Sequence, residues 1–274
     1  MNVNNRLCFI FFNVLLFHIQ ISAQGFSWLS SVEGGNINLT LSTTAVVVDS
    51  SGNSYITGSF YDGATVDTFS LSAVGEEDIF IAKLDSLGNL IWVTTAGGLS
   101  KDLSLDIELD GQGGLYISGV FSDTATFDTI TVSDVTQANC VTNFLAKYST
   151  SGNIQWIKKG AQTLEKNPNS FFYNIASIWN SYIHYSDGYI YYSADNYFKS
   201  GVLASQRSFD SFLLPDFNFS SSPSTLTSIT NSFIYKTDLN GNSSWIRAIS
   251  AKSTNTVTSA SFIKGIAVKS TGQV

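Results

Sequence analysis

The sequence contains two cysteines, Cys8 and Cys140, and two histidines among its 274 residues. Cys8 and His18 both lie within an expected signal peptide, residues 1–23, so cleavage would leave Cys140 and His184 as the one cysteine and the one histidine. A single cysteine excludes an intramolecular disulfide, and one His with one Cys falls short of a usual zinc site. We therefore expect burial of a hydrophobic core to hold the chain together.

Charge is also scarce, because Asp, Glu, Lys and Arg make up only 13% of the residues. The 14 basic and 21 acidic residues give a formal net charge of −7, and no Lys/Arg cluster is present. Phosphates would be repelled by such a chain, so nucleic acid is not an expected partner. A content of 43% hydrophobic residues argues against disorder, and the abundance of Ser, Thr, Asn and Gly is typical of extracellular β-rich proteins.

The N-terminus has the pattern of a secretory signal. Arg6 is the one charged residue before Glu33, an apolar stretch spans residues 7–21, and Ala23 precedes a favourable cleavage point before Gln24. Polar residues interrupt the stretch, so it lacks the continuous apolar run that an uncleaved membrane anchor needs. The mature chain is therefore expected to have no transmembrane span. The protein is predicted to be secreted or held at the cell surface. The first cysteine precedes the apolar core, so a lipid anchor is not indicated.

Three stretches of the sequence resemble one another: DIFIAKLDSLGNLIW (78–92), NFLAKYSTSGNIQW (143–156) and SFIYKTDLNGNSSW (232–245). In each, Phe, Lys, a Gly-Asn pair and Trp recur with fixed offsets. The repeated residues are Phe80, Lys83, Gly88, Asn89, Trp92, Phe144, Lys147, Gly152, Asn153, Trp156, Phe233, Lys236, Gly241, Asn242 and Trp245. Repetition in every unit favours a structural role over a unique site.

The repeats follow one another at a nearly constant interval. Trp28, Trp92 and Trp156 are 64 residues apart, and Trp245 comes 89 residues later. A second motif lies upstream in each unit: AVVVDSSGNSYITGSF (45–60) matches LDIELDGQGGLYISGVF (105–121). A third copy, at 183–198, lacks the Gly-Asn turn, and a fourth begins at 265–274.

Each unit reads as four strands. In the first unit they are predicted at about 44–49, 54–60, 78–84 and 90–95, with one more short strand near 66–71. Gly and Asn accept the positive φ of the connecting turns. The third strand is apolar on both faces, which requires neighbouring layers above and below it. Radially stacked four-stranded sheets supply those layers, so the predicted fold is an all-β propeller, with each Trp wedged between adjacent blades.

The combined motifs, D-x-x-G-N-x-Y-I-T-G-x-F and D-I-F-I-A-K-L-D-x-x-G-N-x-x-W, resemble the bacterial β-propeller repeat called SBBP. The match is strong over residues 45–98, good over 105–161 and partial over 183–250. The resemblance implies a secreted or cell-surface protein and carries no family-wide catalytic residues. The chain would hold about three full repeats with partial blades at both ends, and is expected to be an N-terminal fragment of a longer protein.

The expected organisation follows from these boundaries. After the signal peptide, residues 24–274 form propeller repeats. They divide into a closing strand (about 24–43), repeat 1 (44–98), repeat 2 (105–161), repeat 3 (178–250, with an insertion at 199–230) and the start of repeat 4 (261–274). The insertion is rich in Phe, Leu and Ser, and is either a drifted linker or a partner-binding segment.

Candidate sites are few. Asp238, Asn240 and Asn242 could form a short calcium loop, but a plain turn is favoured because calcium needs six to eight oxygen ligands and the equivalent turns lack the second one. The recurring Lys could line a ligand channel or pair with a nearby Asp. A quinone-dependent dehydrogenase is disfavoured because Asp85 and Gly88 are one residue closer than that repeat expects. No catalytic or cofactor-binding residues are predicted.

Two functions remain open. The first is a non-enzymatic module for binding, adhesion or display at the cell surface, with an unknown protein or glycan as partner. The second is a propeller-fold hydrolase or lyase acting on polysaccharide, which needs two carboxylates at a defined separation. A Ser/His/Asp system would have to use His184, which lies in an alternating, Tyr-rich strand. The hydrolase hypothesis predicts carboxylates converging on the channel, and the binding hypothesis predicts none.

Overall fold

A computed structural model describes residues 32–34, 42–133, 140–165, 181–199, 208–213, 228–249, 259–260, 265–268 and 274. All regular elements in these residues are β-strands, so the all-β prediction is confirmed. The expected signal peptide, the Trp28 region and most of repeat 4 lie outside the described residues.

Three four-stranded antiparallel sheets account for the three repeats. Each sheet takes its strands in chain order, so each repeat folds as one local unit. The first contains β2 (Ser42–Val48), β3 (Ser54–Val66), β4 (Phe69–Leu84) and β5 (Leu90–Gly97). The second contains β6 (Leu103–Leu109), β7 (Gly114–Ser122), β10 (Cys140–Ser149) and β11 (Ile154–Glu165). The third contains β12 (Ser181–Ser186), β13 (Tyr189–Lys199), β16 (Ser228–Asp238) and β17 (Ser243–Ile249).

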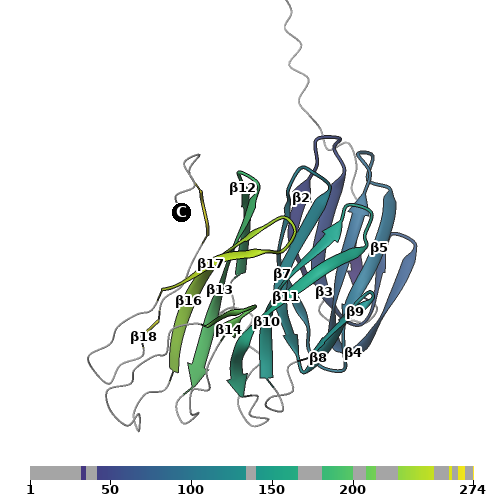
Figure 1. Ribbon diagram of the computed structural model, residues 1–274. Helices are drawn as coiled ribbons and strands as arrows, with labels where there is room; N and C mark the ends of the chain where they lie inside the picture. The colour runs from purple at the N-terminus through teal and green to yellow at the C-terminus, as the bar shows by residue number, and fades with distance from the viewer. Residues whose placement is uncertain are drawn as a thin grey trace, which may run out of the picture.

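The sheets lie face to face in chain order, with the second between the first and the third (Figure 1). The first strands of successive sheets, β2, β6 and β12, contact one another in turn, and we call these the inner strands. One buried cluster joins the first sheet to the second through residues such as Ile81, Ile117 and Phe144. Another joins the second to the third through residues such as Leu145, Ile190 and Tyr235. The core is therefore divided among the junctions between sheets.

The third strand of the first sheet is buried on both faces, as its sequence predicts. Ile79 and Ile81 belong to the cluster shared with the second sheet, whereas Phe80 and Ala82 belong to a separate cluster on the opposite face. Phe80 and Ile79 are both 0% exposed.

A small hairpin projects from each sheet between its second and third strands, and we call it the latch hairpin. It comprises residues 64–66 and 69–72 in the first sheet, β8 (Thr124–Phe127) with β9 (Ile130–Ser133) in the second, and β14 (Ser208–Phe209) with β15 (Phe212–Leu213) in the third. The turns open with Asp67, Asp128 and Asp210, all at φ between 52° and 55°. Because β3 and β4 run into this hairpin, both are longer than predicted.

Each latch hairpin contacts the last strand of the preceding sheet. β5 pairs with β8 through Ala96 and Phe127, and the amide of Asp210 donates to the carbonyl of Lys159 on β11. The first hairpin is paired in the same way with β1 (Val32–Gly34), through Val32 and Val66. The remaining short strand, β18 (Ser259–Ala260), runs parallel to β16.

The expected insertion at 199–230 is therefore not wholly an insertion. Its residues 208–213 form the latch hairpin that the first two sheets also carry, and its first residue and last three belong to β13 and β16. Residues 200–207 and 214–227 lie outside the described part of the chain.

Candidate functional site

The turn around Asp238, the candidate calcium loop, is closed by its own hydrogen bonds. Oδ1 of Asp238 accepts the backbone N–H groups of Asn240 (2.9 Å) and Asn242 (2.8 Å), and Oδ2 accepts the side-chain amide of Asn242 (2.8 Å). Burial would raise the pKa of Asp238, but these hydrogen bonds outweigh it and hold the pKa below its usual range. Both carboxylate oxygens are thus occupied without an ion.

The equivalent turn at Asp85 has the same geometry. Oδ1 accepts the N–H groups of Leu87 and Asn89, and Oδ2 accepts the Asn89 amide at 2.8 Å. In the second sheet Ser149 replaces the aspartate, and its Oγ accepts the N–H of Asn153 at 3.2 Å. The repeated Gly-Asn pair therefore builds a turn. Among the described residues, no group of three or more His, Cys, Asp or Glu side chains is placed to hold a metal ion.

The repeated Lys and Trp lie beside a repeated Tyr in one row across each sheet. In the first sheet Tyr55 pairs with Lys83, which pairs with Trp92. The other two rows are Tyr116–Lys147–Trp156 and Tyr191–Lys236–Trp245. Each ammonium lies 4.9 to 5.3 Å from the ring centroid of its Tyr, within the range of a cation–π contact.

Each of the first two rows packs on a Gly-Asn turn of the next sheet. The indole of Trp92 lies against Gly152, and the indole of Trp156 lies against Gly241, so closely that a Cβ at either glycine would come within 3.2 Å of the ring. Both glycines have positive φ, 90° and 84°, which the turn requires. The Trp92 Nε1–H also donates to the carbonyl of Thr150 at 3.2 Å.

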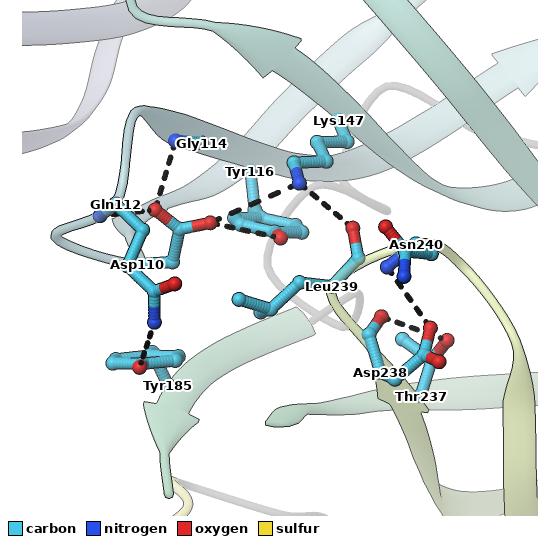
Figure 2. Close-up of polar contacts among 10 residues, drawn as sticks. All are labelled: Asp110, Gln112, Gly114, Tyr116, Lys147, Tyr185, Thr237, Asp238, Leu239 and Asn240. Atoms are coloured by element: carbon cyan, nitrogen blue, oxygen red, sulfur yellow. Dashed lines mark hydrogen bonds and ion pairs between the residues drawn. The ribbon is translucent and has the colours of Figure 1, made fainter. Parts of the chain in front are cut away.

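The junction between the second and third sheets uses a lysine in place of the indole (Figure 2). Lys147 Nζ donates to the carbonyl of Leu239, the equivalent of Thr150, at 2.7 Å, while Trp156 Nε1 is buried with no hydrogen-bond partner. Lys147 also lies 3.8 Å from Asp110 Oδ2, which accepts the hydroxyl of Tyr116. The lysine thus joins a turn of its own sheet to a turn of the next.

Replacing Lys147 with methionine is expected to lower the free energy of unfolding by about 2 kcal/mol, because it removes a charged donor from a partly buried carbonyl and from the buried Asp110 carboxylate. The matched control is Lys83→Met, at the equivalent position in the first sheet, where the ammonium lies over Tyr55. Urea unfolding of both variants measures the difference. Equal losses would show that the bond to Leu239 adds nothing beyond the cation–π contact.

Two carboxylates of β6 lie where the inner strands of the second and third sheets meet. Asp106 Oδ2 accepts the N–H of Ile183 at 2.7 Å, and Glu108 accepts the N–H of Tyr185. Burial raises the pKa of Asp106 to about 6 and also raises that of Glu108, with a further contribution from Asp106. The two acids thus accept hydrogen bonds from backbone N–H groups on the edge of β12 that faces away from β13. The equivalent residues of the first sheet, Ala45 and Val47, are apolar.

A second acidic pair lies between the first two sheets, with Asp78 in β4 and Asp102 directly before β6. Asp78 and Asp102 are 2% and 0% exposed. Asp102 accepts the N–H groups of Ser122 (2.9 Å) and Gly98 (2.7 Å), and Asp78 Oδ2 accepts the N–H of Val74 (2.7 Å). Burial raises the pKa of Asp102 to about 8, helped by the charges of Asp78 and Asp123. Asp78 Oδ1 has no hydrogen-bond partner.

Sequence reasoning missed these acids, and it predicted a single short strand near 66–71 where the structure has the latch hairpin, whose turn begins at Asp67. The hairpin had a signal, because V-D-T-F at 66–69, F-D-T-I at 127–130 and F-D-S-F at 209–212 share a pattern and a place in the repeat. The acids had none, because they occur once each and depend on which strand lies next to them. His184 is half-buried on β12 and pairs with Tyr191 in the sheet.

Exposed apolar side chains lie on the β3–β4 hairpin and on the segment that links β5 to β6. Tyr61 is 41%, Phe69 55%, Val74 69% and Leu99 81% exposed. A Cβ at Gly75 would lie 2.4 Å from the backbone of Leu99, so β4 and the β5–β6 segment run close together at this point. We call these four residues the exposed patch. No helix in the described part of the chain is long and apolar enough to cross a membrane.

Comparison with known proteins gives a limited likeness. No protein-family model matches the chain. An uncharacterized WD repeat-containing protein, L264, of Acanthamoeba polyphaga mimivirus is 29% identical over 106 residues. The match covers 35% of this chain, which spans 8% of that relative's length. The three four-stranded sheets and this likeness agree with one architecture, and the chain is a repeat protein of the β-propeller type.

Proposed function

We propose that the protein is a non-enzymatic β-propeller that binds a protein or glycan outside the cell. The signal-like N-terminus supports secretion, and the SBBP-like motifs support a bacterial cell-surface setting. The observation that carries the proposal is that repeated residues hold the sheets together, whereas the exposed apolar residues are not part of the repeat. The repeated Tyr, Lys and Trp hold neighbouring sheets together, whereas the exposed patch contributes nothing comparable to the core.

The exposed patch is the contact surface of this proposal. Val74 and Leu99 are both largely exposed, on two segments whose backbones approach each other at Gly75, and exposed apolar surface is typical of interaction sites. Acidic side chains border it, with Glu77 bound to Lys101 at 2.7 Å and Glu76 exposed. A partner with an apolar surface and basic groups, or a sugar ring that stacks on Phe69, fits this chemistry.

The polysaccharide hydrolase is the second candidate, because carboxylates do cluster in the structure. Asp106 and Glu108 lie at the inner strands with raised pKa values, as such an enzyme would need. Both, however, accept backbone N–H groups of the neighbouring strand. Asp78 and Asp102 are too deeply buried to touch a polymer. The binding function therefore has the better support.

A double substitution in the exposed patch tests the proposal. Val74→Ser with Leu99→Ser should reduce binding to glycan arrays and to intact cell surfaces at least tenfold, with no loss of thermal stability, because both side chains are exposed. The matched control is Val46→Ser, a similarly exposed valine on β2. Undiminished binding by the double variant would reject the patch. Release of reducing ends from a polysaccharide, abolished by Asp106→Asn, would reject the non-enzymatic function.

A further inference from the structure

Two buried aspartates each close a short backbone loop that carries one residue of the exposed patch. Asp78 Oδ2 accepts the N–H of Val74 at 2.7 Å, across a bulge where the pairing of β4 with β3 is interrupted. Asp102 Oδ2 accepts the N–H of Gly98 at 2.7 Å, within the segment that links β5 to β6. We call these the Asp78 loop, which carries Val74, and the Asp102 loop, which carries Leu99. The position of both patch residues therefore depends on these two acids.

The two loops are in direct contact with each other and with the second sheet. A Cβ at Gly75 would lie 2.4 Å from the carbonyl oxygen of Gly98, and the N–H of Asp102 donates to the carbonyl of Glu77 at 2.6 Å. Asp102 Oδ1 also accepts the N–H of Ser122, at the end of β7, at 2.9 Å. A change in the charge of the acids would therefore act on both loops at once.

The two carboxyl groups face one point beside Gly97. A Cβ at Gly97 would lie 2.2 Å from Asp78 Oδ1 and 3.1 Å from Asp102 Oδ2, so both oxygens border the same small space. Asp78 Oδ1 has no hydrogen-bond partner, although Asp78 is only 2% exposed. A buried carboxylate oxygen that lacks a donor is costly, and a hydrogen between the two acids would supply that donor.

Basic side chains of the described residues do not neutralise this pair of acids. The ammonium of Lys101 is bound to Glu77 at 2.7 Å instead, and Asp123 adds a further negative charge near Asp102. Burial accordingly raises the pKa of Asp78, and raises that of Asp102 to about 8. At neutral pH the pair therefore retains a proton.

We propose that Asp102 and Asp78 share one proton, with the Asp102 carboxyl group donating to Asp78 Oδ1, and that this hydrogen bond regulates the exposed patch by holding its two loops together. The regulation rests on the binding function proposed above, whereas the hydrogen bond does not. When the pH rises above about 8, the proton leaves and two negative charges face each other across a buried space. Their repulsion separates the loops, so partner binding weakens as the pH rises through this value.

Carbon NMR of the full chain, labelled at aspartate Cγ, tests the shared proton directly. The Cγ resonances of Asp78 and Asp102 should move together through one midpoint at about pH 8. Asp78→Asn places a permanent N–H donor beside Asp102 and removes a like charge, so the Asp102 midpoint should fall by about one pH unit or more. The matched control is Asp106→Asn, which removes another acid of raised pKa and should leave the Asp102 midpoint unchanged.

The wild-type titration alone can overturn the shared proton, whether or not the variants fold. An Asp102 resonance that stays at its ionised position above about pH 6 would show that the pair holds no proton at neutral pH. An Asp102 resonance that titrates while that of Asp78 stays fixed would show that the proton is not shared.

Binding measured at two pH values tests the regulation separately from the function. Wild-type binding to glycan arrays and intact cell surfaces should fall about tenfold between about pH 7 and about pH 9, whereas Asp78→Asn should bind equally at both. An equal loss in both proteins would assign the pH dependence to the partner and reject the regulation. If Val74→Ser with Leu99→Ser leaves binding intact, the patch is rejected, while the carboxyl titration still tests the shared proton.

Discussion

Replacing Gly119 with alanine is expected to destabilise the protein by about 3 kcal/mol, because the added methyl group would overlap the backbone of the neighbouring strand. Gly119 lies within β7, where a Cβ would come 2.0 Å from the carbonyl oxygen of Leu103 and 2.9 Å from the Phe144 ring. The backbone oxygen belongs to a neighbouring strand and cannot move without breaking the sheet. Gly58, the equivalent residue in the first sheet, faces the same obstacle from Ser42.

Gly63→Ala is the matched control for this experiment. Gly63 also lies in a second strand, but a Cβ there would meet its nearest atom, the Leu71 carbonyl oxygen, at an ordinary 3.4 Å. Urea unfolding followed by tryptophan fluorescence should therefore separate the two variants by a large shift in midpoint. Similar midpoints would show that β6 and β7 lie further apart than described.

The stability of the wild-type protein is expected to fall as pH rises from about 4 to about 8. Burial disfavours the charge of Asp102 and raises its pKa in the folded state to about 8, from an ordinary value of 3.8. Within this window the folded protein keeps a proton that the unfolded chain releases. The free energy of unfolding therefore decreases by up to about 1.4 kcal/mol per pH unit from this group, and the loss ends above the folded pKa.

Asp102→Asn should remove the contribution of this group across the whole window, because asparagine does not titrate, and should leave the contribution of Asp106 below about pH 6. Asp106→Asn is the matched control: its pKa is raised to about 6, so it should flatten the curve only below that pH. Asp78, Asp123 and the Lys101–Glu77 pair surround Asp102 and remain unchanged in both variants. Urea unfolding at half-unit pH steps gives the curves. A wild-type stability that rises through pH 6–8 would contradict the prediction.

The parts of the fold that follow from local chemistry were predictable from the sequence. Gly88, Gly152 and Gly241 indicate turns, because few other residues accept their positive φ. The regular spacing of Trp92 and Trp156 indicates the repeat. What depends on neighbours was not predictable. The sequence does not distinguish Asp106 from the other acidic residues. Its role follows from the position of β12 beside it, where the N–H of Ile183 donates to its carboxylate.

The same reasoning explains the uneven success within one repeat. The latch hairpin is only a few residues long, and its turn carries Asp at positive φ in place of glycine. A single copy therefore reads as one short strand near 66–71 in the first repeat, and as part of the expected insertion in the third. Only comparison of all three copies, at Asp67, Asp128 and Asp210, would have separated it from the variable segments around it.

The contact of an indole with the next sheet's glycine turn has a direction. Every complete unit presents a tryptophan on one flank and a glycine turn on the other, so units can join only head to tail. Tandem duplication of one 64-residue segment would therefore create a new unit that already carries the tryptophan and the glycine turn needed for both of its junctions. Such a chain can gain or lose length by whole units while its unrepeated loops diverge independently.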